Sequence, residues 1–125
     1  MGFSEADAEK LYYPVDTAPG AVNVAAQEND PASFLNHMKG LIALRHANAD
    51  LQNYSSFAVY SAEKGSRLFA YKRGSYLLAV NPGLNAEELK LDGNYEVVYT
   101  IGNPVVDGRK VTMNAQSFIV LKPAE

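Results

Sequence analysis

From Leu51 onward the chain is a series of short runs rich in β-branched and aromatic residues, separated by turn signals. Asp92-Gly93 and Asp107-Gly108 each stand between apolar runs, and Asp-Gly is a strong hairpin signal because both central residues of a tight turn must tolerate positive φ. The strands expected between the turn signals cover residues 57–60, 67–73, 75–81, 88–91, 95–101, 110–113 and 116–122. This spacing predicts an antiparallel β-sandwich.

Two of these runs also predict burial. The run Tyr76-Leu77-Leu78-Ala79-Val80 is apolar throughout, which predicts a central strand that is covered on both faces. In residues 95–101 the odd-numbered positions are all apolar or aromatic, whereas the even-numbered ones include Glu96 and Thr100. Because side chains alternate between the faces of a strand, the odd-numbered set is expected on the more buried face.

The first fifty residues follow a different pattern. Residues 1–29 contain Pro14, Pro19 and Gly20 and no sustained period, which predicts an irregular loop with one short helical turn at residues 5–10. Asp30-Pro31 then signals a helix start, and the helix is expected to end near Asn48. Its apolar side chains recur at helical spacing: Phe34, Leu35, Met38, Leu41 and Ile42.

The expected fold is therefore mainly β: an antiparallel β-sandwich at residues 51–125, preceded by an irregular loop and one α-helix at residues 1–50. Small residues on a second side of the helix, Gly40, Ala43 and Ala47, suggest that it packs between two layers. Periodicity alone is equally compatible with a core helix of an ordinary α+β domain. That alternative stays open at this point.

Composition excludes several classes of partner. A net charge of -3 in 125 residues leaves no excess of basic side chains for nucleic acid or for an anionic membrane surface. No apolar run approaches the roughly 18 residues that span a bilayer. The chain has no cysteine, and residues 1–10 lack a signal-peptide core, which slightly favours the cytoplasm without establishing the location.

Several segments resemble one enzyme family. Residues 23–27 (Asn-Val-Ala-Ala-Gln), 30–36 (Asp-Pro-Ala-Ser-Phe-Leu-Asn) and 41–45 (Leu-Ile-Ala-Leu-Arg) resemble the segment that enters and forms the last barrel helix of the α-amylase family, glycoside hydrolase family 13. Residues 2–4 (Gly-Phe-Ser) and 11–16 (Leu-Tyr-Tyr-Pro-Val-Asp) look like the loop before that helix. Residues 68–82 are similar to two strands of the family's C-terminal β-sandwich domain.

The resemblance implies a fragment that is not itself an enzyme. In the family, an Asp nucleophile, a Glu acid/base and a second Asp come from earlier barrel strands, and no position here matches their motifs. We therefore expect no catalytic residue, no metal site and no cofactor in this chain. The implied partners are the catalytic barrel and an α-glucan. Tyr12 and Tyr13, in the loop that follows the eighth barrel strand by resemblance, are the candidate substrate-binding residues in the parent enzyme.

The remaining candidates for chemistry have simpler explanations. The carboxylate neighbours Asp7 with Glu9 and Glu87 with Glu88 stand in charged surroundings typical of solvated surface. His37 and His46 have no further ligand at metal-binding spacing.

Two other functions remain open: an independent carbohydrate-binding module, recognisable by coplanar exposed aromatic rings on one sheet face, and an unrelated small interaction domain. Without the barrel, the apolar helix face is expected to pack on the sandwich or to drive self-association.

Overall fold

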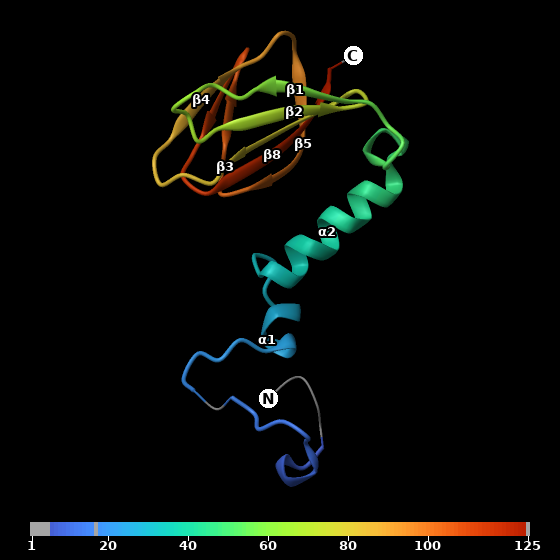
Figure 1. Ribbon diagram of the computed structural model, residues 1–125, viewed down its shortest axis with the longest axis vertical. Helices are drawn as coiled ribbons and strands as arrows, with labels where there is room; N and C mark the ends of the chain where they lie inside the picture. The colour runs from blue at the N-terminus through green and yellow to red at the C-terminus, as the bar shows by residue number, and fades with distance from the viewer. Residues whose placement is uncertain (1–5, 17, 125) are drawn as a thin grey trace. The chain divides into compact units, whose positions relative to one another are not determined.

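The computed structural model describes residues 6–16 and 18–124 (Figure 1). The chain divides into two compact units, Met1–Leu44 and Arg45–Glu125. The second unit contains all the strands found in the described residues, in two antiparallel sheets, so the expected mainly β fold is confirmed. Residues 2–4, one of the segments that carry the family resemblance, lie outside the described residues.

The strands of the second unit form one five-stranded and one three-stranded sheet. The larger sheet has the order β1-β2-β3-β8-β5, and the smaller one has the order β4-β7-β6. Their bounds are β1 Phe57–Ser61, β2 Phe69–Arg73, β3 Tyr76–Asn81, β4 Glu87–Lys90, β5 Tyr95–Ile101, β6 Val105–Asp107, β7 Lys110–Met113 and β8 Ser117–Pro123. All neighbouring strands pair antiparallel.

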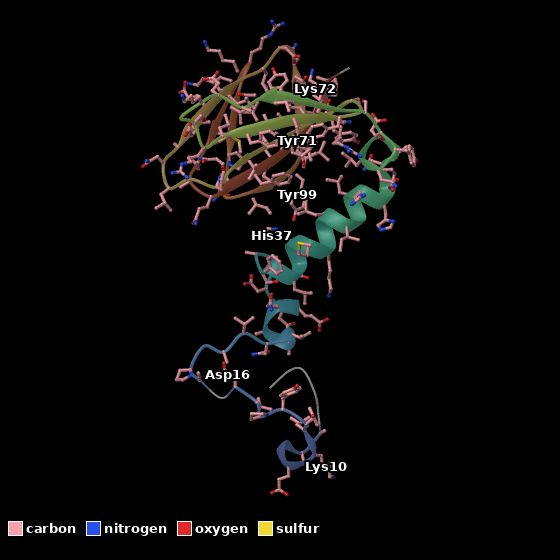
Figure 2. All side chains as sticks on the ribbon, in the orientation of Figure 1. Lys10, Asp16, His37, Tyr71, Lys72 and Tyr99 are labelled. Carbon is pink, nitrogen blue, oxygen red and sulfur yellow. The ribbon has the colours of Figure 1, made fainter. Side chains whose placement is uncertain are left out.

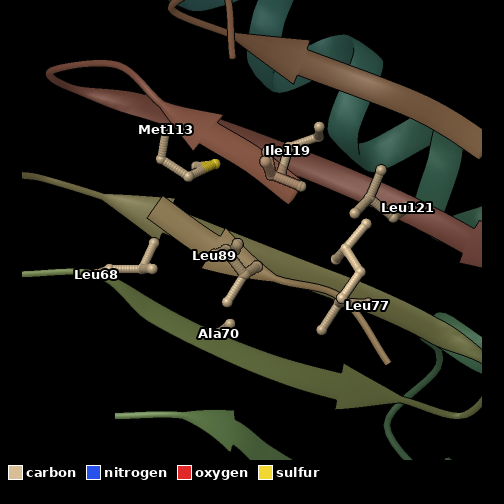
Figure 3. Close-up of a cluster of buried hydrophobic side chains, with 10 residues drawn as sticks. Leu68, Ala70, Leu77, Leu89, Met113, Ile119 and Leu121 are labelled. Carbon is tan, nitrogen blue, oxygen red and sulfur yellow. The ribbon is translucent and has the colours of Figure 1, made fainter. Parts of the chain in front are cut away.

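One apolar core lies between the two sheets (Figure 3). Side chains that alternate along β2, β3 and β8 meet side chains from β4 and β7, and the fully or nearly fully buried members include Ala70, Leu77, Ala79, Leu89, Val111, Met113, Ile119 and Leu121. β3 lies between β2 and β8, and Leu77, Leu78 and Ala79 are all buried. The expectation that residues 76–80 form a central strand covered on both faces is therefore confirmed.

The burial pattern expected for β5 is wrong at its middle. The register of β5 against β8 shifts between Val97 and Tyr99, which is a β-bulge. The extra residue of a bulge is left unpaired and disrupts the ladder locally. At this point Val97 is about half exposed and Val98 is less exposed, whereas Tyr99 and Ile101 beyond it are half-buried as expected.

β6 is a strand that the sequence pattern did not predict. It has only three residues, Val105–Asp107, and it follows a turn in which Gly102 and Asn103 both have positive φ. Its pairing with β7, from Val105↔Thr112 to Asp107↔Lys110, gives it its extended conformation. A run this short carries too little local signal to be separated from the turn before it.

The first unit contains short helices and irregular chain. A 3-10 turn, η1, covers Ala8–Lys10, and two α-helices follow, α1 at Val24–Glu28 and α2 at Phe34–Ala47, which continues past the division at Leu44. The expectation of an irregular chain up to residue 29 is wrong at α1, where the Asn23 side chain caps the helix by accepting from the Ala26 N–H at 2.9 Å. None of the described helices is long and apolar enough to cross a membrane.

Helix α2 begins later than Asp30-Pro31 suggested. The Asp30 carboxylate accepts from the Ala32 N–H at 2.9 Å and stabilises a turn instead of a helix start. The Ser33 hydroxyl accepts from the Asn36 N–H at 3.2 Å, which is the contact expected of an N-cap residue. Both residues can cap a helix, and the one that lies next to the helical backbone does so here.

The connection from α2 to the sandwich is anchored on the β2–β3 hairpin. It contains a second 3-10 turn, η2, at Ala49–Leu51. The Asp50 carboxylate accepts from the Ser75 N–H at 2.8 Å and from the Ser75 hydroxyl, and these bonds lower the pKa of Asp50. Gly74, at φ 53°, is required here because a Cβ at this position would lie 2.5 Å from the Asp50 Cγ. The Tyr76 hydroxyl adds a bond to the Asn48 side chain at 2.6 Å.

Candidate functional site

The first unit contains a hollow of about 930 Å³. It is lined by described residues between Ala6 and Gln27, and both candidate tyrosines belong to its wall. Tyr12 and Tyr13 are 91% and 76% exposed, and their rings meet edge to face with centroids 4.9 Å apart. A concave surface of this size with exposed aromatic rings has the dimensions of a small-ligand site.

The polar side chains of this hollow are largely engaged in holding the backbone. The Asp16 carboxylate accepts from the Ala18 N–H at 2.9 Å, and Asn23 caps α1. The Gln27 side-chain oxygen accepts from the Leu35 N–H at 3.0 Å. The hollow therefore offers a ligand mainly apolar surface, to which the tyrosine rings and the exposed Val22 both contribute.

The corner between α1 and α2 makes that wall rigid on one side. The Gln27 carbonyl accepts from the Ser33 hydroxyl at 2.7 Å and from the Asn36 amide at 2.9 Å. The same Asn36 amide also reaches the carbonyls of Glu28 and Asp30, at 3.2 and 2.8 Å. Gln27, Ser33 and Asn36 belong to the segments that carry the resemblance, but only the structure shows that they bind one another.

The candidate carboxylates are engaged in ordinary surface contacts. Asp7 pairs with Lys10 at 2.8 Å, and Glu88 pairs with Lys110 at 2.7 Å. The Glu87 carboxylate accepts from the Arg67 N–H at 3.1 Å and the Ser66 hydroxyl at 2.9 Å, and these bonds lower its pKa. A general acid in glycoside hydrolysis needs a raised pKa. The lowered pKa of Glu87 is therefore the opposite of what that role requires.

The two histidines are separated along α2. His37 lies toward the start of α2 (Figure 2) and is half-buried, whereas His46 is exposed in the last turn. Within residues 6–16 and 18–124 no three His, Cys, Asp or Glu side chains come together in a group that could hold a metal ion.

An apolar stripe runs along α2. We use this name for Phe34, Met38 and Ile42, which follow one another at intervals of four residues and are 76%, 40% and 52% exposed. Leu35 and Leu41 beside them are half-buried, and no side chain of α2 is fully buried. Residues four apart lie on one face of a helix, so this stripe is a continuous apolar surface.

The larger sheet carries an aromatic row on β1 and β2, formed by Phe57, Phe69 and Tyr71. The ring centroids of Phe57 and Phe69 both lie 5.5 Å from that of Tyr71, with interplanar angles of 33° and 27°. The Phe69 and Tyr71 rings stack on each other, so the faces they share are not available to a sugar. A binding platform needs rings side by side with free faces, and this row lacks that arrangement.

A polar cluster joins the two sheets at another place. The Tyr60 hydroxyl, on β1, donates to the Lys90 carbonyl on β4 at 3.0 Å and accepts from the Asp92 N–H at 2.7 Å. The Asp92 carboxylate in turn accepts from the Lys72 ammonium and the Tyr95 hydroxyl, each at 2.8 Å. Lys72 and then Tyr95 lower the pKa of Asp92, and burial raises the pKa of Tyr95. Each of these side chains is hydrogen-bonded to another member or to the main chain, so we interpret the cluster as one that holds the two sheets together.

Comparisons with known proteins give structural neighbours only. No family model and no curated protein matches the chain. The isomaltulose synthase from Erwinia rhapontici NX5 is 24% identical with a TM-score of 0.69, over 80% of this chain and 19% of that one. The trehalulose synthase MutB from Pseudomonas mesoacidophila MX-45 is 21% identical with a TM-score of 0.71, over 81% of this chain and 20% of that one.

The matches cover most of this chain but only a small part of each neighbour. The chain spans about a fifth of the length of the solved structures it matches. Residues 45–125 are about two thirds of the chain, so a match over 80% also takes in part of the helical unit. The fold of this chain is thus that of a segment, with a C-terminal-domain-like β-sandwich, found within enzymes of the α-amylase family, glycoside hydrolase family 13.

Proposed function

We propose that this chain is the non-catalytic C-terminal part of an α-glucan-acting glycoside hydrolase, and that it packs on the catalytic barrel and stabilises it. The observation that carries this proposal is the apolar stripe of Phe34, Met38 and Ile42. The neighbours support it, because each is a family-13 enzyme about five times as long as the part it shares with this chain.

The energetics of the stripe favour a covering partner. Burial of a large apolar side chain stabilises a protein by about 1.5–3 kcal/mol. Three such side chains on one helix face, with the half-buried Leu35 and Leu41 beside them, make a surface whose exposure to water is costly. A barrel that packs on this surface would also bury apolar surface of its own and be stabilised by that burial. Helix α2 would then form the contact between this chain and the barrel.

The test is co-expression of this chain with the polypeptide encoded upstream of it. We expect the two to co-purify and to release reducing sugar from an α-glucan, whereas the chain alone releases none. Ile42→Asp should abolish co-purification because it places a charge in the stripe, and the control His46→Asp, at an exposed position in the last turn of the helix, should not. Co-purification that withstands Ile42→Asp, or an upstream polypeptide that does not bind at all, would contradict the proposal.

We further propose that Tyr12 and Tyr13 line the substrate cleft of the assembled enzyme. Their exposed rings on the wall of the hollow support this role, since sugars stack their apolar faces on aromatic rings. Tyr12→Ala with Tyr13→Ala should raise KM for a malto-oligosaccharide on the order of tenfold, the effect of about 1.4 kcal/mol of lost contact. The matched control is Tyr54→Ala, which removes an equally exposed tyrosine from the other unit and should leave KM unchanged. Equal KM values for the three proteins would remove these tyrosines from the cleft.

The alternative of an independent carbohydrate-binding module has weaker support. It depends on coplanar aromatic rings with free faces on one sheet face. In the aromatic row the rings of Phe69 and Tyr71 stack on each other. Saturable binding of maltoheptaose to the isolated chain, with chemical-shift changes on β1 and β2, would favour the module over the barrel partner.

A further inference from the structure

The chain contains two Asp-Gly pairs, Asp92-Gly93 and Asp107-Gly108, in very different surroundings. An aspartate before glycine can isomerise without an enzyme, because glycine has no Cβ to hinder the approach of its nitrogen to the aspartate side chain. We propose that Asp107-Gly108 is a site of spontaneous aspartate isomerisation, and that Lys72 and Tyr95 protect Asp92-Gly93 from the same reaction.

The reaction needs only water. The Gly108 nitrogen attacks the protonated side-chain carboxyl carbon of Asp107, a C–N bond forms, and the hydroxyl group leaves as water with the amide proton. The product is a five-membered succinimide. Water then adds to the ring carbonyl that belonged to the main chain, and the bond from that carbon to the Gly108 nitrogen breaks. The carboxyl group is restored on the main-chain carbon, and the peptide link now passes through the side chain as isoaspartate.

The surroundings of Asp107 leave this path open. It is exposed at the end of β6, and Gly108 begins the turn to β7 at φ 55°, with open space where a side chain would stand. Its register partner, Lys110, donates to Glu88 at 2.7 Å, and Glu88 raises the pKa of Lys110 more than the charge of Asp107 does. Among the described residues no hydrogen-bond donor contacts the Asp107 carboxylate.

The surroundings of Asp92 hinder the attack of the Gly93 nitrogen on its carboxyl group. One carboxylate oxygen accepts from the Lys72 ammonium and the other from the Tyr95 hydroxyl, each at 2.8 Å. To reach the Gly93 nitrogen the carboxyl group would first have to leave both donors. Lys72 and Tyr95 also lower the pKa of Asp92, so the protonated form that loses water is rarer than at an ordinary aspartate.

The modification would have a local structural consequence. Isoaspartate lengthens the main chain by one methylene group, at the residue where the pairing of β6 with β7 ends. The neighbouring pair Val106↔Val111 carries a fully buried valine of the core. Isomerisation should therefore loosen β6 from the smaller sheet.

The test is ageing of the purified chain at neutral and mildly acidic pH, followed by digestion with endoproteinase Asp-N, which cuts before aspartate but not before isoaspartate. We expect cleavage before Asp107 to be lost, and cleavage before Asp92 to be lost on the order of tenfold more slowly, as freeing a charge-assisted hydrogen bond requires. In urea, where neither carboxylate is held, the two rates should be similar. Asp107→Glu should prevent the modification at this site, because the larger ring forms slowly.

Two variants examine the protection at Asp92. Lys72→Met with Tyr95→Phe should bring its rate close to that of Asp107, while Asp107 itself is unchanged. If this double variant does not fold, the proposal is still tested by the unmodified chain, in which the isomerisation rates at Asp92 and Asp107 are compared in the folded and in the urea-unfolded state. Equal rates at the two sites in the folded chain, or no isoaspartate at Asp107 when the unfolded chain forms it, would overturn the proposal.

Discussion

Replacing Asn81 by Leu is expected to lower the free energy of unfolding by about 3–5 kcal/mol. Asn81 lies at the end of β3 and is completely buried. Its amide nitrogen donates to three backbone carbonyls, those of Asn85 at 2.8 Å and of Met113 and Asn114 at 3.0 Å each. Its oxygen accepts from the Gly83 N–H at 3.0 Å. Leucine has a similar volume but would leave these backbone groups without their partner.

The effect is measured by chemical denaturation followed by circular dichroism. Asn94→Ala is the matched control, because Asn94 is exposed in a turn, and it should change the free energy of unfolding by less than about 0.5 kcal/mol. If the two variants were equally stable, Asn81 would not hold the β3–β4 and β7–β8 turns together as the structure indicates.

Leu77→Ala should lower the free energy of unfolding by about 2–5 kcal/mol. Leu77 is fully buried on β3, where it pairs in register with Leu121 of β8, and both belong to the core between the sheets (Figure 3). The substitution loses the favourable free energy of moving the removed carbon atoms from water into the core. It also leaves a cavity that the surrounding side chains fill only in part.

The control for this prediction is a leucine on the surface. Leu84 is 80% exposed in the turn after β3, and Leu84→Ala should stay within about 0.5 kcal/mol of the unmodified chain. Measured side by side by thermal unfolding, the two leucine variants differ only in burial. Similar melting temperatures would mean that the core does not carry the stability of the sandwich.

Local features of the sequence predicted most of the strands. β3, β5 and β7 coincide with expected runs or differ from them by one residue, because turn residues and alternating apolar residues act within a few positions of one another. Asp107-Gly108 does join a hairpin, β6 with β7, but the hairpin expected at Asp92-Gly93 is wrong, because β4 pairs with β7 and β5 pairs with β8 in the other sheet. The same locality explains the apolar stripe, since residues four apart share a helix face whatever the rest of the chain does. Both are properties of neighbouring residues.

Features that depend on pairing between distant residues were predicted poorly. β6 exists because β7 lies beside it, and the bulge in β5 is defined only against β8. The start of α2 at Phe34 depended on which of two capping side chains came next to the helical backbone.

The sites show the same division. Tyr12 and Tyr13 are candidates that a family resemblance in residues 11–16 suggested, and both line one hollow in the structure. Asn81, by contrast, meets carbonyls 32 and 33 positions away, and Tyr60 meets Asp92 across 32 positions. The sequence by itself determined where most of the strands lie and where apolar side chains recur, because those depend on short-range geometry. Only the tertiary structure decided which polar groups meet, because a one-residue change in strand register moves every side chain to the opposite face.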